Sequence, residues 1–251
     1  MIVRDAFSRC RLGRWAAVLL LGLLAPRPAA GQDPAPAPVK VLLYASFDQA
    51  PDKPLFSARP VKLSATDVLH DPLGRSGAAV DFPESCGDAA RLRFELDEPG
   101  LARSGAIAFW LRPDAFNTLS VHTENLLRVL DRQGKPLFSI NKSGHVTIAR
   151  PDREVKLPLF DSLWWLGGEW HHLVLAWDAA GSPVTSHRGL VRVFWNARPY
   201  GAFNLDLDIA PAVLEFGDRG LGCAVDELHV LDRPLSVRTI WELMRRTAAL
   251  S

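Results

Sequence analysis

The chain has 251 residues, 29 of them basic and 28 acidic, and 48% of its residues are hydrophobic. This nearly balanced charge gives no electrostatic footprint for nucleic acid or for an anionic membrane surface, so we expect neither as a partner. The length suits a single all-β domain.

The first 31 residues are typical of a secretory signal peptide. Arginines between Arg4 and Arg14 precede a short apolar run, Trp15–Leu24, and small residues lead to Gly31. Because the run is too short for a membrane span, we expect cleavage after Gly31 and a secreted or periplasmic mature chain without a membrane span. Losing five arginines and one aspartate changes the formal net charge from +1 to −3. An uncleaved anchor is the alternative.

Residues 32–39 (QDPAPAPV) form a Pro/Ala-rich linker with too little apolar surface to fold. No second composition shift or internal repeat follows. We therefore expect one domain over residues 40–251.

Short apolar or alternating segments recur along this domain, separated by turn residues. We predict strands over residues 39–47, 77–82, 91–96, 105–113, 124–131, 136–141, 145–150, 169–178, 190–197, 213–217 and 223–232. Gly134 supplies the positive φ of a hairpin turn between two of these strands. The pattern predicts an all-β fold, a two-sheet antiparallel β-sandwich of jelly-roll type.

The segment Glu169–Asp178 (EWHHLVLAWD) is apolar on both faces of an extended strand, which predicts a central strand covered on both sides. His171 and His172 then point to opposite faces and cannot chelate one ion. We expect a buried, hydrogen-bonded His172.

A short C-terminal helix follows Ser236, which is suited to the N-cap position. Ile240, Leu243 and Met244 form its apolar stripe. We expect this helix to cover an open end or edge of the sandwich.

Six segments in this order resemble a LamG-like jelly roll of the concanavalin A-like lectin/glucanase superfamily. They are LLYASFD (42–48), GRSGAAVDF (74–82), SGAIAFWLRP (104–113), EWHHLVLAWD (169–178), VRVFWNARPYG (191–201) and AVDELHVLDRPLS (224–236). The resemblance implies the fold, and a family of sugar-binding modules, adhesion modules and domains appended to enzymes. Ala197 stands where the family's turn usually has glycine, which predicts different turn geometry, and the loop after Phe47 is unusually long.

The resemblance also implies that the first and last strands are neighbours, which brings Asp48 near Asp226 and Glu227. Such carboxylates could hold a structural Ca²⁺ ion. The alternative is that Asp226 accepts hydrogen bonds from backbone amides and tightens a turn.

Trp164 and Trp165 precede the central strand and are candidates for carbohydrate binding, because sugar rings stack on exposed indole faces. The alternative is that they cover the core. Cys86 and Cys223, the cysteines left after processing, could form a disulfide in an oxidising compartment, or stay separate thiols.

The sequence shows no catalytic constellation. The segment AVDELHV lacks both outer glutamates of the E-x-D-x-x-E arrangement found in glucanases of this fold, and no nucleophile triad or phosphate loop is visible. We therefore expect an exported, non-catalytic binding module for carbohydrate, supported by calcium. The alternatives are an adhesion module that recognises a cell-surface protein, and a glycan-active enzyme with an unrecognised site.

Overall fold

The structure is a computed structural model that describes residues 38–54, 56–86, 90–114, 125–141, 145–149, 154–158, 167–179, 190–204, 213–217 and 221–248. These residues belong to one compact unit, Pro38–Ser251. The predicted signal peptide and nearly all of the predicted linker, residues 1–37, lie outside the described residues.

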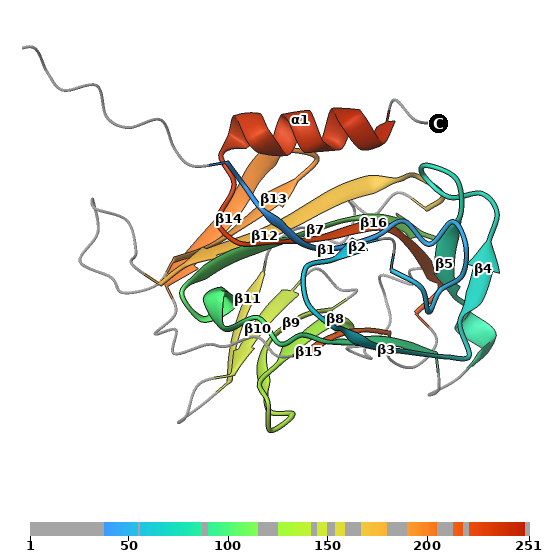
Figure 1. Ribbon diagram of the computed structural model, residues 1–251, viewed down its shortest axis with the longest axis horizontal. Coiled ribbons are helices and arrows are strands. Elements are labelled where there is room, and N and C mark those ends of the chain that lie inside the picture. The colour runs from blue at the N-terminus through green and yellow to red at the C-terminus, as the bar shows by residue number, and fades with distance from the viewer. Residues whose placement is uncertain are drawn as a thin grey trace, which may run out of the picture. The chain divides into compact units, whose positions relative to one another are not determined.

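The described residues form two antiparallel sheets (Figure 1). The nine-stranded sheet runs in the order β14 (Arg198–Asn204), β13 (Leu190–Trp195), β12 (His171–Asp178), β7 (Ser104–Pro113), β16 (Cys223–Leu231), β1 (Val41–Ala45) and β2 (Phe56–Ser57). The two remaining strands of this sheet lie off this order: β5 (Ala79–Phe82) pairs with β16, and β4 (Leu69–Asp71) pairs with β5.

The second sheet has seven strands in the described part of the chain, in the order β11 (Glu154–Pro158), β10 (His145–Ala149), β9 (Pro136–Asn141), β8 (Asn125–Leu130), β15 (Val213–Phe216), β6 (Arg91–Glu95) and β3 (Lys62–Thr66). Short 3₁₀ turns, Glu84–Cys86 and Pro99–Ala102, lie between strands. The predicted all-β sandwich is therefore confirmed.

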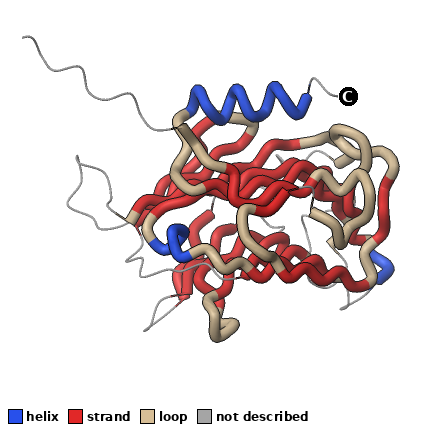
Figure 2. The backbone as a smooth tube through the Cα atoms, in the orientation of Figure 1, coloured by secondary structure: helices blue, strands red, loops and turns tan. Residues whose placement is uncertain are grey.

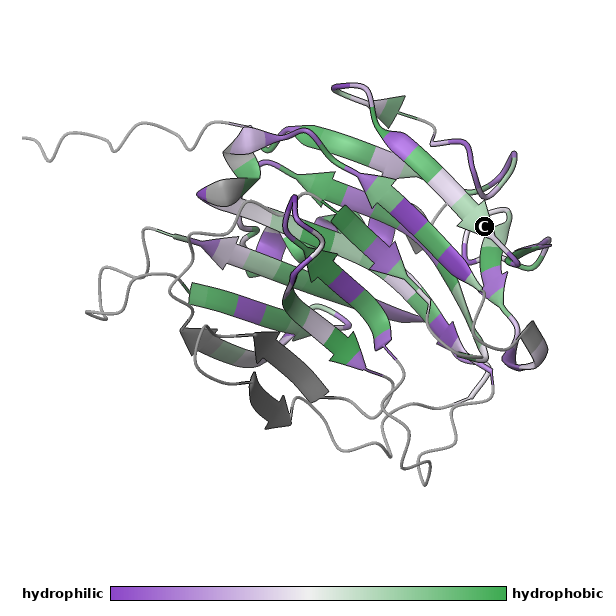
Figure 3. Ribbon diagram, turned by 90° about the horizontal axis from the view of Figure 1, so that it is seen from below, coloured by the Kyte–Doolittle hydropathy of each residue, from purple (hydrophilic) through white to green (hydrophobic). Residues whose placement is uncertain are grey.

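The core lies between the two sheets, because successive side chains on a strand point to opposite faces. In β7, Ile107, Phe109 and Leu111 belong to the inter-sheet cluster, whereas Ala106 and Ala108 belong to a cluster on the outer face. Figure 3 shows hydrophobic and hydrophilic residues along the same strands. One sheet face thus builds the core, and the other face is available for helix packing or binding.

Strand β12 is the predicted central strand, and it is buried on both faces. Leu173, Leu175 and Trp177 face the inter-sheet core, and Val174 and Ala176 face the outer cluster. The Trp177 indole N–H donates a hydrogen bond to the Leu101 carbonyl at 2.7 Å. This bond satisfies the indole N–H, which would otherwise be buried without a partner.

The helix α1 (Val237–Ala248) covers the outer face of the nine-stranded sheet, so the prediction that it covers an end or an edge was wrong (Figures 1 and 2). Ile240 is fully buried, and Leu243 and Met244 pack against the same cluster. The helix packs on this face because the small side chains of Ala106 and Ala108 leave room for it there. The predicted N-cap is confirmed, since the Thr239 N–H donates to the Ser236 hydroxyl at 3.1 Å.

The turn between β13 and β14 also differs from its prediction. Asn196 and Ala197 both adopt positive φ, 47° and 62°, as a two-residue type I′ hairpin requires. Ala197 therefore occupies the usual glycine position without a change of turn geometry. Its side chain is buried in the α1 cluster, and Asn196 accepts a hydrogen bond from the His172 backbone N–H at 2.8 Å. These contacts offset the backbone strain.

Candidate functional site

An open groove of about 600 Å³ lies on the outer face of the seven-stranded sheet, where β6 ends and β3 and β15 begin. We call it the sheet-end groove; it is lined by Pro60, Val61, Lys62, Arg93, Glu95, Leu96, Asp97, Arg132 and Val213. Strand register places Lys62 opposite Glu95, and Glu95 opposite Val213, so three strands contribute one row of its lining.

Charged donors and acceptors alternate around this groove. Lys62 Nζ lies 3.5 Å from Glu95 Oε1, and Arg93 Nε lies 3.5 Å from the same oxygen. Arg132 Nη2 lies 2.7 Å from Asp97 Oδ1. Because the Lys62 and Arg132 pairs are largely exposed, they contribute little to stability and leave their polar atoms available to a ligand.

Arg93 forms an ion pair with Glu215, a nearly fully buried residue of β15. Arg93 Nη1 lies 3.3 Å from Glu215 Oε2, and Arg128 of β8 pairs with the other carboxylate oxygen. A buried carboxylate between two guanidinium groups is compensated for the loss of water. The network fixes the Arg93 side chain at the inner wall of the groove.

The long loop after Phe47 reaches the same groove. Arg59 Nη1 donates to the Asp97 carbonyl at 3.2 Å, and Arg59 Nε lies 3.6 Å from Glu98. Pro60 and Val61 then form part of the lining. This long loop therefore contributes part of the lining of the candidate site.

A second groove, of about 330 Å³, lies between α1 and strands β1 and β16. We call it the helix groove; its lining is Val39, Val41, Tyr44, Glu227, His229, Leu231, Leu235, Thr239, Glu242, Leu243 and Arg246. The Tyr44 hydroxyl donates to Glu227 Oε2 at 2.8 Å, and the Tyr44 and His229 rings lie 4.6 Å apart. His229 Nδ1 contacts the Glu227 carbonyl at 2.9 Å, so it carries the proton of that hydrogen bond.

The helix groove includes a strained residue, because Glu227 has a φ of 53° in a bulge of β16 between Asp226 and His229. Burial raises the pKa of Glu227 to about 7, and the nearby Asp48 charge adds to the rise. Burial also raises the pKa of Tyr44 and lowers the pKa of His229.

Asp48 and Asp226 anchor the loop between β4 and β5. Asp226 Oδ2 accepts hydrogen bonds from the N–H groups of Arg75 (2.8 Å) and Ser76 (3.0 Å), and Oδ1 accepts one from Glu227 N–H (2.7 Å). Asp48 Oδ1 accepts a hydrogen bond from the Ala78 N–H at 3.0 Å. These bonds agree with the alternative interpretation of Asp226, in which it accepts hydrogen bonds from backbone amides and tightens a turn.

The anchoring carboxylates do not fit a calcium site. Ca²⁺ takes about six to eight oxygen ligands, whereas the oxygens of Asp226 face backbone N–H donors. Among the described residues, no group of three or more His, Cys, Asp or Glu side chains could hold a metal ion. Burial raises the pKa of Asp226 to about 7, and the neighbouring Glu227 charge contributes to this rise.

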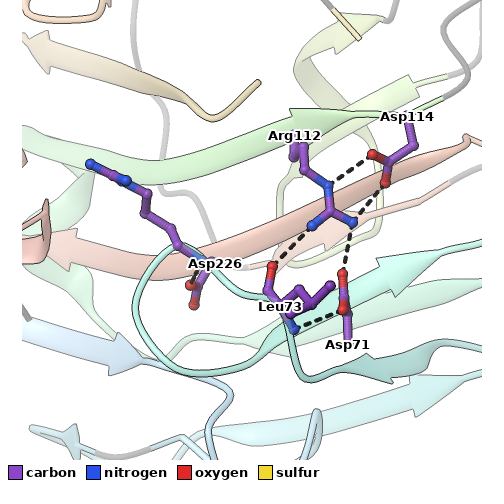
Figure 4. Close-up of polar contacts among 6 residues, drawn as sticks. Asp71, Leu73, Arg112, Asp114 and Asp226 are labelled. Carbon is purple, nitrogen blue, oxygen red and sulfur yellow. Dashed lines mark hydrogen bonds and ion pairs between the residues drawn. The ribbon is translucent and has the colours of Figure 1, made fainter. Parts of the chain in front are cut away.

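Arg112 of β7 fixes the same loop from the other side (Figure 4). Its guanidinium donates to Asp71 at 2.7 Å, to Asp114 at 2.8 and 3.0 Å and to the Leu73 carbonyl at 2.9 Å. Leu73 N–H in turn donates to Asp71 at 2.9 Å. Arg112 thus anchors the start of this loop, and Asp226 and Asp48 anchor its later part, which contains the first residues of GRSGAAVDF.

The structure does not test the predicted tryptophan and cysteine sites. Trp164 and Trp165 lie outside the described residues, so their role stays a prediction. Cys223 is buried in β16 opposite Phe82, and the side chain of Cys86 is not described, so their pairing also stays a prediction.

The two histidines of the central strand point to opposite faces, as predicted. His171 stacks on Trp195 of the inter-sheet core at 4.5 Å, and His172 contacts Trp110 at 5.1 Å. The expectation of a hydrogen-bonded His172 ring was wrong for Nδ1, which is buried without a partner among the described residues. Burial lowers the pKa of His172 to about 3, so the ring stays neutral.

Comparison with known proteins places the chain among all-β sandwiches. No protein-family model and no curated protein matches the sequence. Solved structures that match include the receptor-binding domain of the botulinum neurotoxin C/D mosaic serotype (TM-score 0.63, 10% identity), that of type G (0.59, 13%) and the binding domain of neurotoxin DC in complex with rat synaptotagmin II (0.64, 12%).

The matches cover 82–84% of this chain but only 51–52% of those domains, so the chain spans about half of their length. At this level of identity the likeness establishes the fold alone. Among the described residues, no helix is long and apolar enough to cross a membrane.

Sequence reasoning missed both grooves. The sheet-end groove is formed by residues far apart in the chain, from Pro60 to Val213, and its edge strand β3 is short and half exposed. One signal was present, because KLSAT (Lys62–Thr66) alternates polar and apolar side chains.

Proposed function

We propose that this chain is an exported, non-catalytic binding module of the LamG-like type whose ligand is carbohydrate, bound in the sheet-end groove. The observation that carries the proposal is the lining of that groove, where exposed cations and carboxylates surround apolar side chains. Sugar hydroxyls both donate and accept hydrogen bonds, so they need both kinds of partner. The C–H faces of a sugar ring need apolar contacts, and Val61, Leu96 and Val213 are the apolar residues of the lining.

Two further observations support this proposal. The groove is open, so it can admit one part of a long chain. The solved structures with the same fold include receptor-binding domains, and we extend that general role, binding, to this chain.

The raised pKa of Glu227 favours a second candidate, a glycan-active enzyme that uses this residue as a general acid. Glycoside hydrolysis commonly needs a second carboxylate that faces the same bond. Asp226 is fully buried and accepts three backbone hydrogen bonds, so it cannot take that role. Binding therefore remains the proposal.

The test is a glycan and polysaccharide binding screen on the purified protein, run with Ca²⁺ and again with EDTA. We expect binding of at least one carbohydrate class without release of new sugar ends. Loss of binding in EDTA would contradict the conclusion that the Asp48 and Asp226 carboxylates do not fit a calcium site. If no carbohydrate in the screen binds, the proposal is contradicted and a protein partner is favoured. Release of sugar ends would favour the enzyme.

The variant Arg132→Ala locates the binding surface. Arg132 is 63% exposed and pairs with an exposed Asp97, so its removal leaves stability nearly unchanged. We expect at least about fivefold weaker binding, the loss of one hydrogen bond to a charged group. Arg238→Ala is the matched control, because Arg238 also belongs to an exposed pair, with Glu242 on α1 and away from the sheet-end groove. Equal affinities of both variants would exclude the sheet-end groove.

A further inference from the structure

The helix groove differs in chemistry from the sheet-end groove. Its aliphatic lining comes from the chain before and within β1 (Val39, Val41), from the end of β16 (Leu231), from the segment between β16 and α1 (Leu235) and from α1 (Leu243). A volume of about 330 Å³ is within the range of small-ligand pockets. Aliphatic walls of this kind suit an alkyl or acyl chain better than a sugar ring.

A buried carboxylate lies at the sheet side of this groove. Glu227 is 3% exposed, and its side chain hydrogen bonds with the Tyr44 hydroxyl at 2.8 Å. A carboxylate has about four acceptor positions, so this bond leaves capacity for a further donor. An ionised carboxylate removed from water is costly until a cation or more donors compensate it.

The backbone holds Glu227 in this position at a cost. A positive φ of 53° is rare for a residue with a long side chain, and the bulge leaves Glu227 and Leu228 without partners in the register with β7. Strain of this kind persists only where the surrounding structure imposes it, and such residues cluster at ligand sites. The bulge directs the Glu227 side chain to Tyr44 and the groove.

The charges around Glu227 favour a cationic ligand. The charge of Asp48, which follows β1, raises the pKa of Glu227, and the charge of Glu227 in turn raises the pKa of Asp226 of β16. Tyr44 of β1 and His229 of β16 are neutral near pH 7, because burial raises the pKa of the tyrosine and lowers that of the histidine.

From α1, Glu242 and Arg246 line the groove with opposite charges, and Glu242 is paired with Arg238 at 3.0 Å. The helix therefore adds no net charge to the lining. Above about pH 7, where Asp226 and Glu227 become ionised, the carboxylates of β16 leave the sheet side of the groove negative.

We propose that the helix groove binds an alkylamine, an apolar chain that ends in an ammonium group, with the ammonium held by Glu227 and Tyr44. The aliphatic walls hold the chain, and the carboxylate compensates the charge. A free carboxylate ligand would meet repulsion from Glu227, and an alcohol would lack the charge. This site is independent of the sheet-end groove and of carbohydrate binding.

Calorimetric titration of the purified protein with hexylammonium at pH 8 tests the proposal, with hexanol, hexanoate and methylammonium as comparison probes. We expect hexylammonium to bind at least about tenfold more tightly than hexanol, since a charge-assisted hydrogen bond is stronger than a neutral one. Methylammonium and hexanoate are expected to bind more weakly still. Equal affinity for hexylammonium and hexanol, or no binding of hexylammonium, would overturn the proposal.

Two variants with the same chemical change locate the ammonium. Glu227→Gln keeps an acceptor for Tyr44 but removes the charge, and we expect about tenfold or greater loss of hexylammonium affinity. Glu84→Gln, at an exposed residue of the 3₁₀ turn Glu84–Cys86 outside the groove lining, is the matched control, with less than about threefold loss. An unchanged affinity of Glu227→Gln, whose folding is checked by its melting curve, would overturn the assignment.

The dependence on pH gives a readout that needs no variant. Hexylammonium stays protonated from pH 6 to pH 8, whereas Glu227, with its pKa raised to about 7 by burial, becomes ionised over this interval. We expect affinity to rise with pH. Affinity that is constant or falls between pH 6 and pH 8 would contradict a role for Glu227.

Discussion

Asp226 and Glu227 are adjacent carboxylates with different surroundings. Asp226 is enclosed by backbone N–H groups of the loop it anchors, and Glu227 lies at the helix groove with Tyr44 as its partner. Residue types alone could not separate these roles, because the bulge that turns the two side chains apart is a property of the β16–β7 register. The sequence indicated only that acidic residues would gather near Asp48.

The raised pKa of Glu227 predicts a pH-dependent stability. The folded protein keeps a proton on this group up to about pH 7, whereas the unfolded chain releases it near the ordinary value of 4.5. This group's contribution to stability is therefore present at low pH and is lost as the pH rises from about 4.5 to 7. Asp226, whose pKa burial also raises to about 7, acts in the same direction.

The variant Glu227→Gln isolates this effect, because the buried His172 and His229 act in the opposite direction below about pH 6.5 in both proteins. We expect the free energy of unfolding of the variant, relative to the unsubstituted protein, to increase by on the order of 2 kcal/mol between pH 5 and pH 8. Chemical denaturation at both pH values measures this difference. A difference that does not change with pH would show that Glu227 titrates normally.

At the scale of elements, the structure shows why some strands were predicted and others were not. The strands missing from the prediction as separate strands are β2, β3, β4, β11 and β14, and each of them lies at an edge of its sheet. An edge strand has fewer buried positions, so its hydrophobic pattern is weaker than that of a central strand such as β12.

The position of α1 is the clearest case in which packing decided what the sequence pattern left open. The apolar stripe predicted the buried face of the helix, but the alanines of β7 that receive it are about 130 residues away in the chain. Only the tertiary structure shows that they lie on the outer sheet face.

Two neighbouring helix residues test this packing. Ile240 is fully buried against the sheet, so Ile240→Ala is expected to lower the free energy of unfolding by about 2–4 kcal/mol. Trp241 is 45% exposed, and Trp241→Ala is expected to cost less than about 1 kcal/mol. Urea denaturation of both variants gives the comparison, and a larger loss for Trp241 would place the other helix face on the sheet.

At the scale of the whole molecule, the sequence predicted the class of fold because its central strands carry strong and regular patterns. The candidate site was less accessible to prediction. The sheet-end groove combines a loop after β1, the ends of three strands and a hairpin turn, and its charged residues are ordinary surface charges when viewed one at a time. They form a candidate site only because they are arranged around apolar lining residues such as Val61 and Val213.

Backbone hydrogen exchange, measured with and without the carbohydrate that binds best in the screen, tests the central proposal most directly. The proposal predicts slower exchange in residues 61–66 and 93–97, because β3 is an edge strand whose outer amides are open to solvent until a ligand covers the groove. Residues of α1 should exchange as before. Protection confined to α1 and β16, or protection of no part of the sheet-end groove, would contradict the assignment of this groove as the carbohydrate site.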